Sequence, residues 1–141
     1  MLFNAKYLLF HVCVLHRAGL NVNNYNYRMN ISSTVFLNNT ATDRGGGLSI
    51  SSFNYYFLMD KCLLQGNTAV YKYGGAFYIY ADNWYITVQY SNFIENVAEL
   101  YGGAVDLYSN NDFVMFIHSN VRLIDYNIHY YYQSVYLLLF E

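Results

Sequence analysis

Two short motifs recur three times at one spacing, and this repeat constrains the fold more than any other feature of the sequence. A glycine pair followed by a small residue and an apolar residue occurs as GGGL, GGAF and GGAV, with the second glycine at Gly46, Gly75 and Gly103. These glycines lie 29 and 28 residues apart. A fixed period of about 20 to 50 residues is the signature of solenoids and other repeat architectures.

A second motif keeps the same period upstream of each glycine pair, as FLNNTA, LQGNTA and FIENVA. It begins at Phe36, Leu64 and Phe93, carries its asparagine at Asn39, Asn67 and Asn96, and ends at Ala41, Ala69 and Ala98. Because both motifs hold one register, residues 36–108 form the best-defined repeats of a single domain spanning residues 1–141. Residues 1–35 and 109–141 are interpreted as degenerate coils.

The degenerate coils are predicted by projecting the period outwards. Projecting by 28 residues places Leu8 on Phe36, Cys13 on Ala41, and Gly19 to Val22 on Gly47 to Ile50. Projecting forwards places Val121 on Phe93 and puts Tyr131 and Tyr132 where the glycine pair would stand. The repeat therefore decays at both ends, as expected of a fragment of a longer solenoid.

Apolar residues alternate with period two after each glycine pair, which is typical of a strand. Phe77 and Ile79 fall on one face and Tyr78 and Tyr80 on the other, and no unit offers a capped helical stretch of ten or more residues. A unit of short strands buries its apolar face only by stacking on copies of itself. The sequence therefore predicts an all-β chain, a parallel β-helix of about four to five coils.

The repeated positions have predicted places in such a coil. The glycine pairs that contain Gly46, Gly75 and Gly103 are expected to supply corners with positive φ. Asn39, Asn67 and Asn96 are expected at another corner, in the left-handed region, with amides bonded between coils. Three inward stacks are predicted: Phe36, Leu64 and Phe93; Leu48, Phe77 and Val105; and Ile50, Ile79 and Leu107.

These motifs resemble those of the polymorphic outer membrane proteins, in which GGA followed by an aliphatic residue alternates with FxxN. GGAV at Gly102 to Val105, FLNN and FIEN match outright, and GGAF, GGGL and LQGN depart by one residue. The resemblance implies a right-handed parallel β-helix of the pectin-lyase-like type. It also implies an adhesin at the cell surface or secreted, in the outer membrane if the source is bacterial.

Function is predicted from the outward side of the strand that follows the glycines. Its ladder reads Asn21, Ser49, Tyr78 and Asp106, with Asn23, Ser51, Tyr80 and Tyr108 beside it. Tyr78, Tyr80, Asp106 and Tyr108 are the candidate binding residues, for a host-cell protein, a matrix protein or a glycan. The alternative is that the tyrosines only pack against each other across coils as good strand formers.

Catalysis is not expected, and no catalytic residue is assigned. Glycoside hydrolysis uses two carboxyls, and this ladder offers one, with Asp82 and Asp112 as a weak acidic pair at the following corner. The prediction is a non-enzymatic structural or adhesive module. The alternative is a carbohydrate-binding or pectin-lyase-like polysaccharide-degrading fragment.

Charge and metal-ligand chemistry narrow the partners. The chain has a formal net charge of −2 and only 11% charged residues, so no nucleic-acid partner is expected. Cys13 and Cys62 fit no zinc or redox spacing and are interpreted as small buried residues. The histidines lack acids or cysteines at ligand spacing, so neither a metal nor a cofactor is expected.

The two ends carry the remaining predictions. Residues 7–19 have the length of a signal-peptide core but also follow the repeat register, which favours a first coil. No run reaches the roughly 18 apolar residues of a membrane span. Residues 129–141 are apolar and aromatic, so self-association through uncapped ends is predicted.

Overall fold

In the computed structural model, every strand pairing is parallel, and the strands assemble into four sheets. The structure describes the backbone of residues 3–6, 9–11, 14–17, 19–122, 128–130 and 134–138, and the side chains of residues 19–120. No helix occurs in these parts of the chain. The predicted all-β class is therefore confirmed.

Sheet A contains β1 (Phe3–Lys6), β5 (Tyr27–Ser32), β9 (Tyr55–Asp60), β13 (Trp84–Gln89), β17 (Asp112–Ile117) and β20 (Ser134–Leu138). Sheet B contains β2 (Leu9–His11), β6 (Val35–Leu37), β10 (Leu63–Gln65), β14 (Asn92–Ile94) and β18 (Asn120–Arg122). Sheet C contains β3 (Val14–Arg17), β7 (Thr40–Arg44), β11 (Thr68–Ala69) and β15 (Val97–Ala98). Sheet D contains β4 (Leu20–Val22), β8 (Leu48–Ile50), β12 (Phe77–Ala81), β16 (Val105–Ser109) and β19 (Ile128–Tyr130).

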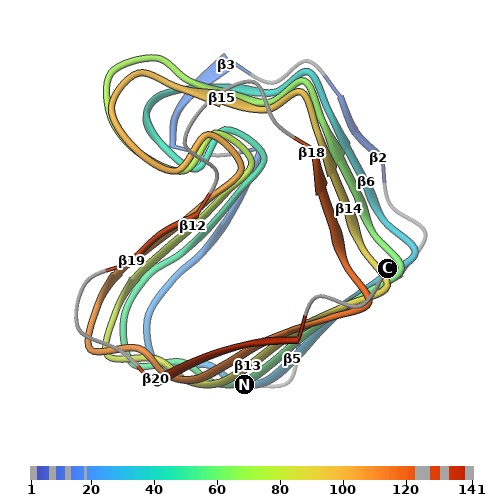
Figure 1. The fold of residues 1–141 in the computed structure, drawn as a ribbon, viewed down its shortest axis with the longest axis vertical. Coiled ribbons are helices and arrows are strands. Elements are labelled where there is room, and N and C mark those ends of the chain that lie inside the picture. The colour runs from blue at the N-terminus through green and yellow to red at the C-terminus, as the bar shows by residue number, and fades with distance from the viewer. Residues whose placement is uncertain are drawn as a thin grey trace.

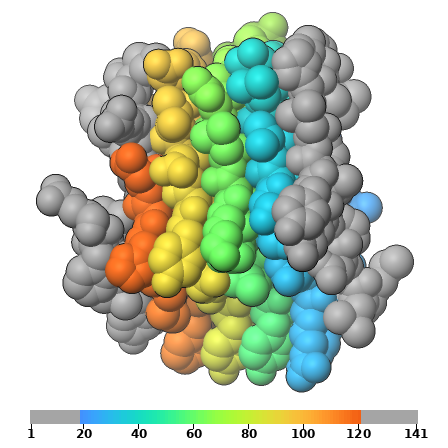
Figure 2. All heavy atoms as spheres, turned by 90° about the vertical axis from the view of Figure 1, so that its right-hand side faces the viewer, coloured from blue at the N-terminus to red at the C-terminus, as the bar shows by residue number. Residues whose placement is uncertain are grey.

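The chain visits the four sheets in the order A, B, C, D and then returns to A one coil further along. Strands β1 to β16 complete four turns of this path, and β17 begins another. Figure 1 looks along the stack, so the coils superpose around one interior. Figure 2 shows the face of sheet B, where successive coils lie side by side in sequence order. This arrangement is the predicted β-solenoid.

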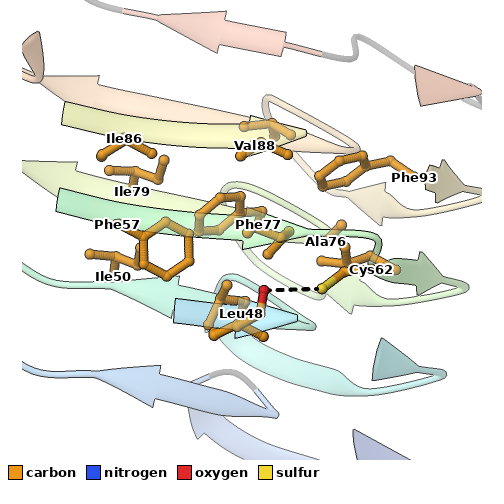
Figure 3. Packing of buried hydrophobic residues seen from close by; sticks show 14 of the residues in the cluster. Leu48, Ile50, Phe57, Cys62, Ala76, Phe77, Ile79, Ile86, Val88 and Phe93 are labelled. Atoms are coloured by element: carbon orange, nitrogen blue, oxygen red, sulfur yellow. Dashed lines mark hydrogen bonds between the residues drawn. The ribbon is translucent and has the colours of Figure 1, made fainter. Parts of the chain in front are cut away.

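The interior stacks follow the predicted register. Leu64 pairs with Phe36 and Phe93, Phe77 with Leu48 and Val105, and Ile79 with Ile50 and Leu107. All nine side chains are fully buried. Figure 3 shows Leu48, Phe77, Ile50 and Ile79 in this core beside Phe57 from sheet A. Burial of each large side chain contributes about 1.5 to 3 kcal/mol, so these stacks dominate the stability of the described coils.

The two glycines of each pair have different roles, which corrects the predicted corner. Positive φ occurs at the first glycine, for example 63° at Gly74, with the same conformation at Gly45 and Gly102. At Gly75, the second glycine, a Cβ would instead collide with the carbonyl oxygens of Gly103 and Val97. One glycine therefore allows the turn, and the next allows the neighbouring coil to approach.

The asparagine ladder forms, but the left-handed residue is the one before each asparagine. The backbone N–H and Nδ2 of Asn39 donate to Oδ1 of Asn67, both at 3.0 Å, and those of Asn67 donate to Oδ1 of Asn96 at 2.9 Å. The positive φ angles belong to Asn38, Gly66 and Glu95. The asparagines are needed as buried bridges between coils rather than for their own backbone conformation.

The N-terminal projection is correct at one end of the coil and wrong at the other. Leu20 pairs with Leu48, as predicted, but Phe10 rather than Leu8 pairs with Phe36, and Leu15 rather than Cys13 pairs with Ala41. The offset is 26 residues there, and it lengthens through an irregularity between Leu15 and Arg17. Leu8 and Cys13 themselves lie outside the described residues.

The C-terminal projection is also partly correct. Val121 pairs with Phe93, as predicted. Ile128 pairs with Val105, so this coil is shorter, and positions 131 and 132 do not stand opposite the glycine pair. Tyr131 and Tyr132 lie outside the described residues, and self-association through the ends stays a prediction.

Candidate binding site

The outward ladder of sheet D has the predicted register but not the predicted exposure. Tyr78 pairs with Ser49 on one side and with Asp106 on the other. Only 2% of Tyr78 and 1% of Asp106 are exposed. The expectation that these two residues form an open outward face is therefore wrong.

The turn from sheet C to sheet D covers these residues. In Figure 1 this connection swings outwards as a lobe, at the upper left, before the chain enters sheet D. A Cβ on Gly74 would lie 3.0 Å from the Cβ of Tyr78, and one on Gly102 would lie 2.8 Å from the Cβ of Asp106. The glycine turns thus fold directly against the outward side of the strand that follows them.

Arg44 and Tyr73 complete this cover over Tyr78. Arg44 Nη1 donates to Tyr78 Oη at 2.9 Å, and the Tyr73 and Tyr78 rings stack with centroids 6.4 Å apart. Burial raises the pKa of the Tyr78 phenol well above its ordinary value, and the nearby Arg44 opposes this rise only in part. Tyr78 is therefore a neutral, structural side chain at physiological pH.

Tyr80 and Tyr108 remain nearer to solvent and stack on each other. Their ring centroids are 5.3 Å apart and their planes differ by 14°. Tyr80 is 39% exposed, and Tyr108 is half-buried. Because a stacked ring uses one face on its neighbour, this pair fits the alternative that the tyrosines pack across coils.

A polar cleft lies beside Tyr78 and Tyr80, where Ser49 and Ser51 occupy the same ladder positions one coil earlier. The small serines leave a hollow next to the two rings, with a volume of about 400 Å³. Its lining consists of Asn24, Asp43, Arg44, Ser49, Ser51, Ser52, Tyr78 and Tyr80. Asp43 Oδ1 lies 2.7 Å from Lys72 Nζ, and Asp43 Oδ2 lies 3.5 Å from Arg44 Nε.

The sequence analysis missed a second aromatic surface, at the start of the sheet A strands. Tyr56, Tyr85 and Phe113 form a continuous stack with centroids 4.8 and 4.9 Å apart, and 42% to 45% of each is exposed. Tyr55 and Trp84 stack beside them at 4.8 Å. We call Tyr55, Tyr56, Trp84, Tyr85 and Phe113 the aromatic ladder.

A repeated asparagine could have revealed this surface. Asn26, Asn54, Asn83 and Asn111 keep the same 28- and 29-residue spacing, each stands just before these aromatic positions, and each Oδ1 from Asn54 onwards accepts from the asparagine one coil earlier. The residues before them, Tyr25, Phe53, Asp82 and Asn110, all have positive φ. The coil therefore has two asparagine corners with the same construction.

Comparison with known proteins places part of this construction in a family. Residues 33–51 match the family model of the Chlamydia polymorphic membrane protein repeat. The matched segment contains the FLNN and GGGL motifs, and β6, β7 and β8 lie within it. The chain carries the polymorphic membrane protein repeat. No curated protein and no solved structure matches the chain.

The polymorphic membrane protein repeat supplies several cleft residues. Asp43, Arg44, Ser49 and Ser51 all fall within the matched segment. The lobe residues of the next coil, which carry Lys72 and Tyr73, lie outside it. The cleft is therefore built where one matched repeat meets the following coil.

Acidic and thiol groups near these repeats do not assemble a further centre in the described part of the chain. Asp112 pairs with Trp84 rather than with the coil position of Asp82, so the two carboxyls do not occupy equivalent places. No group of three or more His, Cys, Asp or Glu side chains gathers among the described residues. Cys62 is buried, and burial raises its thiol pKa, while Cys13 lies outside the described residues.

Membrane-spanning helices were sought in the same residues. None of the described segments forms a helix long and apolar enough to cross a membrane.

Proposed function

We propose that the chain is a non-enzymatic β-solenoid module at the cell surface or in the secreted fraction, with a structural and adhesive role. The matched repeat supports this role, since the polymorphic outer membrane proteins that the motifs resemble are surface adhesins. Function lives in sites rather than in folds, so the adhesive part of the proposal rests on a specific surface.

The aromatic ladder is the observation that carries the adhesive role. Its exposed Tyr56, Tyr85 and Phe113 form one apolar strip across three coils. Tyrosine and tryptophan are enriched among the residues that dominate protein binding energies. Each ring is held between its neighbours in the stack, so little side-chain freedom is lost when a partner binds.

A protein fits this strip better than a sugar polymer does. The Tyr56 and Tyr85 planes differ by only 6°, and those of Tyr85 and Phe113 by 8°. Faces that stack on each other are not available to sugar rings, whereas ring edges and tyrosine hydroxyls remain outward. We therefore take the partner of the aromatic ladder to be a host-cell or matrix protein with an apolar surface.

A non-enzymatic role is supported by the placement of the acids. The usual glycoside hydrolysis route uses two carboxyls about 5 to 9.5 Å apart. The sheet D ladder presents Asp106 alone among its described members, and that residue is buried beneath the glycine turn. The polysaccharide-degrading alternative has no comparable supporting observation.

Adhesion of the purified chain to cultured cells and to immobilised matrix proteins tests the proposal. The test variant combines Tyr56→Asn, Tyr85→Asn and Phe113→Asn, because asparagine tolerates the positive φ of these positions. We expect binding to weaken about tenfold or more, while the exposed pair Tyr71→Asn and Tyr90→Asn leaves it unchanged. Absence of binding by the folded chain, or binding unaffected by the triple variant, would overturn the adhesive role.

A further inference from the structure

Arg44 is held in the cleft as a fixed cation with unused hydrogen-bond donors. Its guanidinium carbon lies 5.6, 5.2 and 5.7 Å from the ring centres of Tyr73, Tyr78 and Tyr80. Nη1 donates to Tyr78, whereas the buried Nε has no hydrogen-bond acceptor. A guanidinium has five N–H donors and keeps its charge at any accessible pH. The three rings therefore position a receptor for an anion.

The charges around the cleft also favour an anion. Asp43 faces two cations, because Lys72 Nζ lies 2.7 Å from one carboxylate oxygen and Arg44 Nε lies 3.5 Å from the other. Asp106 is one coil further on, on the opposite side of Tyr78 from Ser49. The rim beside the hollow therefore has more positive than negative charge, which attracts a carboxylate.

The rest of the lining suits a ligand with several hydroxyl groups. Ser49, Ser51 and Ser52 contribute hydroxyls, and Asn24 contributes an amide whose Oδ1 already accepts from the Ser52 N–H at 3.0 Å. Opposite Ser49, Oδ1 of Asn21 is buried and has no hydrogen-bond partner. A volume of about 400 Å³ is at the small end of ligand pockets, which fits one sugar ring.

We propose that this cleft binds a single sugar ring that carries a carboxylate, with Arg44 receiving the carboxylate and the serine hydroxyls and Asn24 receiving the ring hydroxyls. Tyr80 supplies the apolar wall against which the ring packs. The site uses none of the residues of the aromatic ladder. Its ligand is therefore separate from the protein partner of the proposed adhesive role, and either proposal stands if the other fails.

A matched pair of sugars tests the site on the full chain. Methyl β-D-glucuronide and methyl β-D-glucoside differ only in the carboxylate, and each can be titrated while backbone amide signals are followed by NMR. We expect the glucuronide to bind about tenfold more tightly or better, with shifts centred on Ser49, Ser51 and Arg44. Equal binding of the two sugars, shifts centred elsewhere, or no binding would overturn the proposal.

Two variants separate recognition from folding. Arg44→Gln should remove the preference for the glucuronide, whereas Arg28→Gln, at an exposed arginine that also lies over a tyrosine ring, should keep it. Ser51→Tyr should extend the Tyr80–Tyr108 stack into the hollow and abolish binding without loss of thermal stability. Unchanged binding by folded Arg44→Gln or Ser51→Tyr protein would contradict the site.

An acidic peptide group is the competing ligand for the same chemistry. N-acetylglutamate amide presents a carboxylate without ring hydroxyls, so we expect it to bind at least about tenfold more weakly than the glucuronide. Binding of equal strength would assign the cleft to an acidic side chain of a protein and overturn the sugar proposal.

Discussion

At the scale of single residues, Asn67 shows how a buried polar side chain can hold neighbouring coils together. It accepts from Asn39 through Oδ1 and donates through Nδ2 to Asn96 Oδ1 and to the Phe36 carbonyl, each at 2.9 to 3.0 Å. Truncation leaves these groups buried without partners, and each such group costs about 1 to 3 kcal/mol. We expect Asn67→Ala to lower the free energy of unfolding by about 3 kcal/mol or more in denaturant titrations. Asn92→Ala, at an exposed asparagine, should change it by less than about 0.5 kcal/mol. Similar losses for both variants would contradict this role.

Tyr78 makes the stability depend on pH in the alkaline range. Its pKa is raised in the folded chain by burial, while a phenol in the unfolded chain keeps a pKa near about 10. The unfolded state therefore loses its proton first, so this contribution is complete below pH 10 and falls as the pH rises above it. We expect Tyr78→Phe to flatten the fall in unfolding free energy between about pH 9 and 11. Tyr71→Phe, at an exposed tyrosine, should leave the slope unchanged.

At the scale of structural elements, the glycine turn is the part of the coil least tolerant of an added methyl group. A Cβ at Gly75 would collide with backbone oxygens of both Gly103 and Val97, which cannot rotate away. At Gly47 the nearest atom would be the Ala76 carbonyl oxygen at 2.8 Å, and the equivalent positions already hold Ala76 and Ala104. We expect Gly75→Ala to cost at least about 3 kcal/mol, and Gly47→Ala less than about 1 kcal/mol. Equal thermal stabilities of the two variants would show that close coil approach at Gly75 is not required.

The elements also show which features a sequence of this kind can predict. The period sets the register of sheets B, C and D between Thr40 and Leu107, because each motif contains part of a strand. The cover over Tyr78 could not be predicted, since alternation distinguishes inward from outward residues but does not describe a lobe that folds back over the outward side. The shortened first coil was missed because a constant offset cannot detect the two residues absent before Phe36. The aromatic ladder could have been found, because Asn54 and Asn83 repeat at the same period as Asn39 and Asn67.

At the scale of the whole molecule, one repeated coil both builds the core and places the binding surfaces. Every coil contributes inward residues such as Leu64 and Phe93, whose stacks make each coil depend on its neighbours. Phe93→Ala should therefore lower the unfolding free energy by about 3 to 5 kcal/mol through a cavity in a continuous core. Phe113→Ala, in the exposed aromatic ladder, should cost less than half of that amount.

Backbone NMR tests the central claim, the parallel stacking of coils, most directly. Parallel pairing brings Phe36, Leu64 and Phe93 into one row and Leu48, Phe77 and Val105 into another. The account predicts cross-strand amide and Hα nuclear Overhauser effects that link residues 28 or 29 positions apart throughout residues 35–107. An antiparallel pattern, in which the separation of linked residues changes steadily along a strand, would contradict it, as would helical amide connectivities between Phe36 and Tyr108.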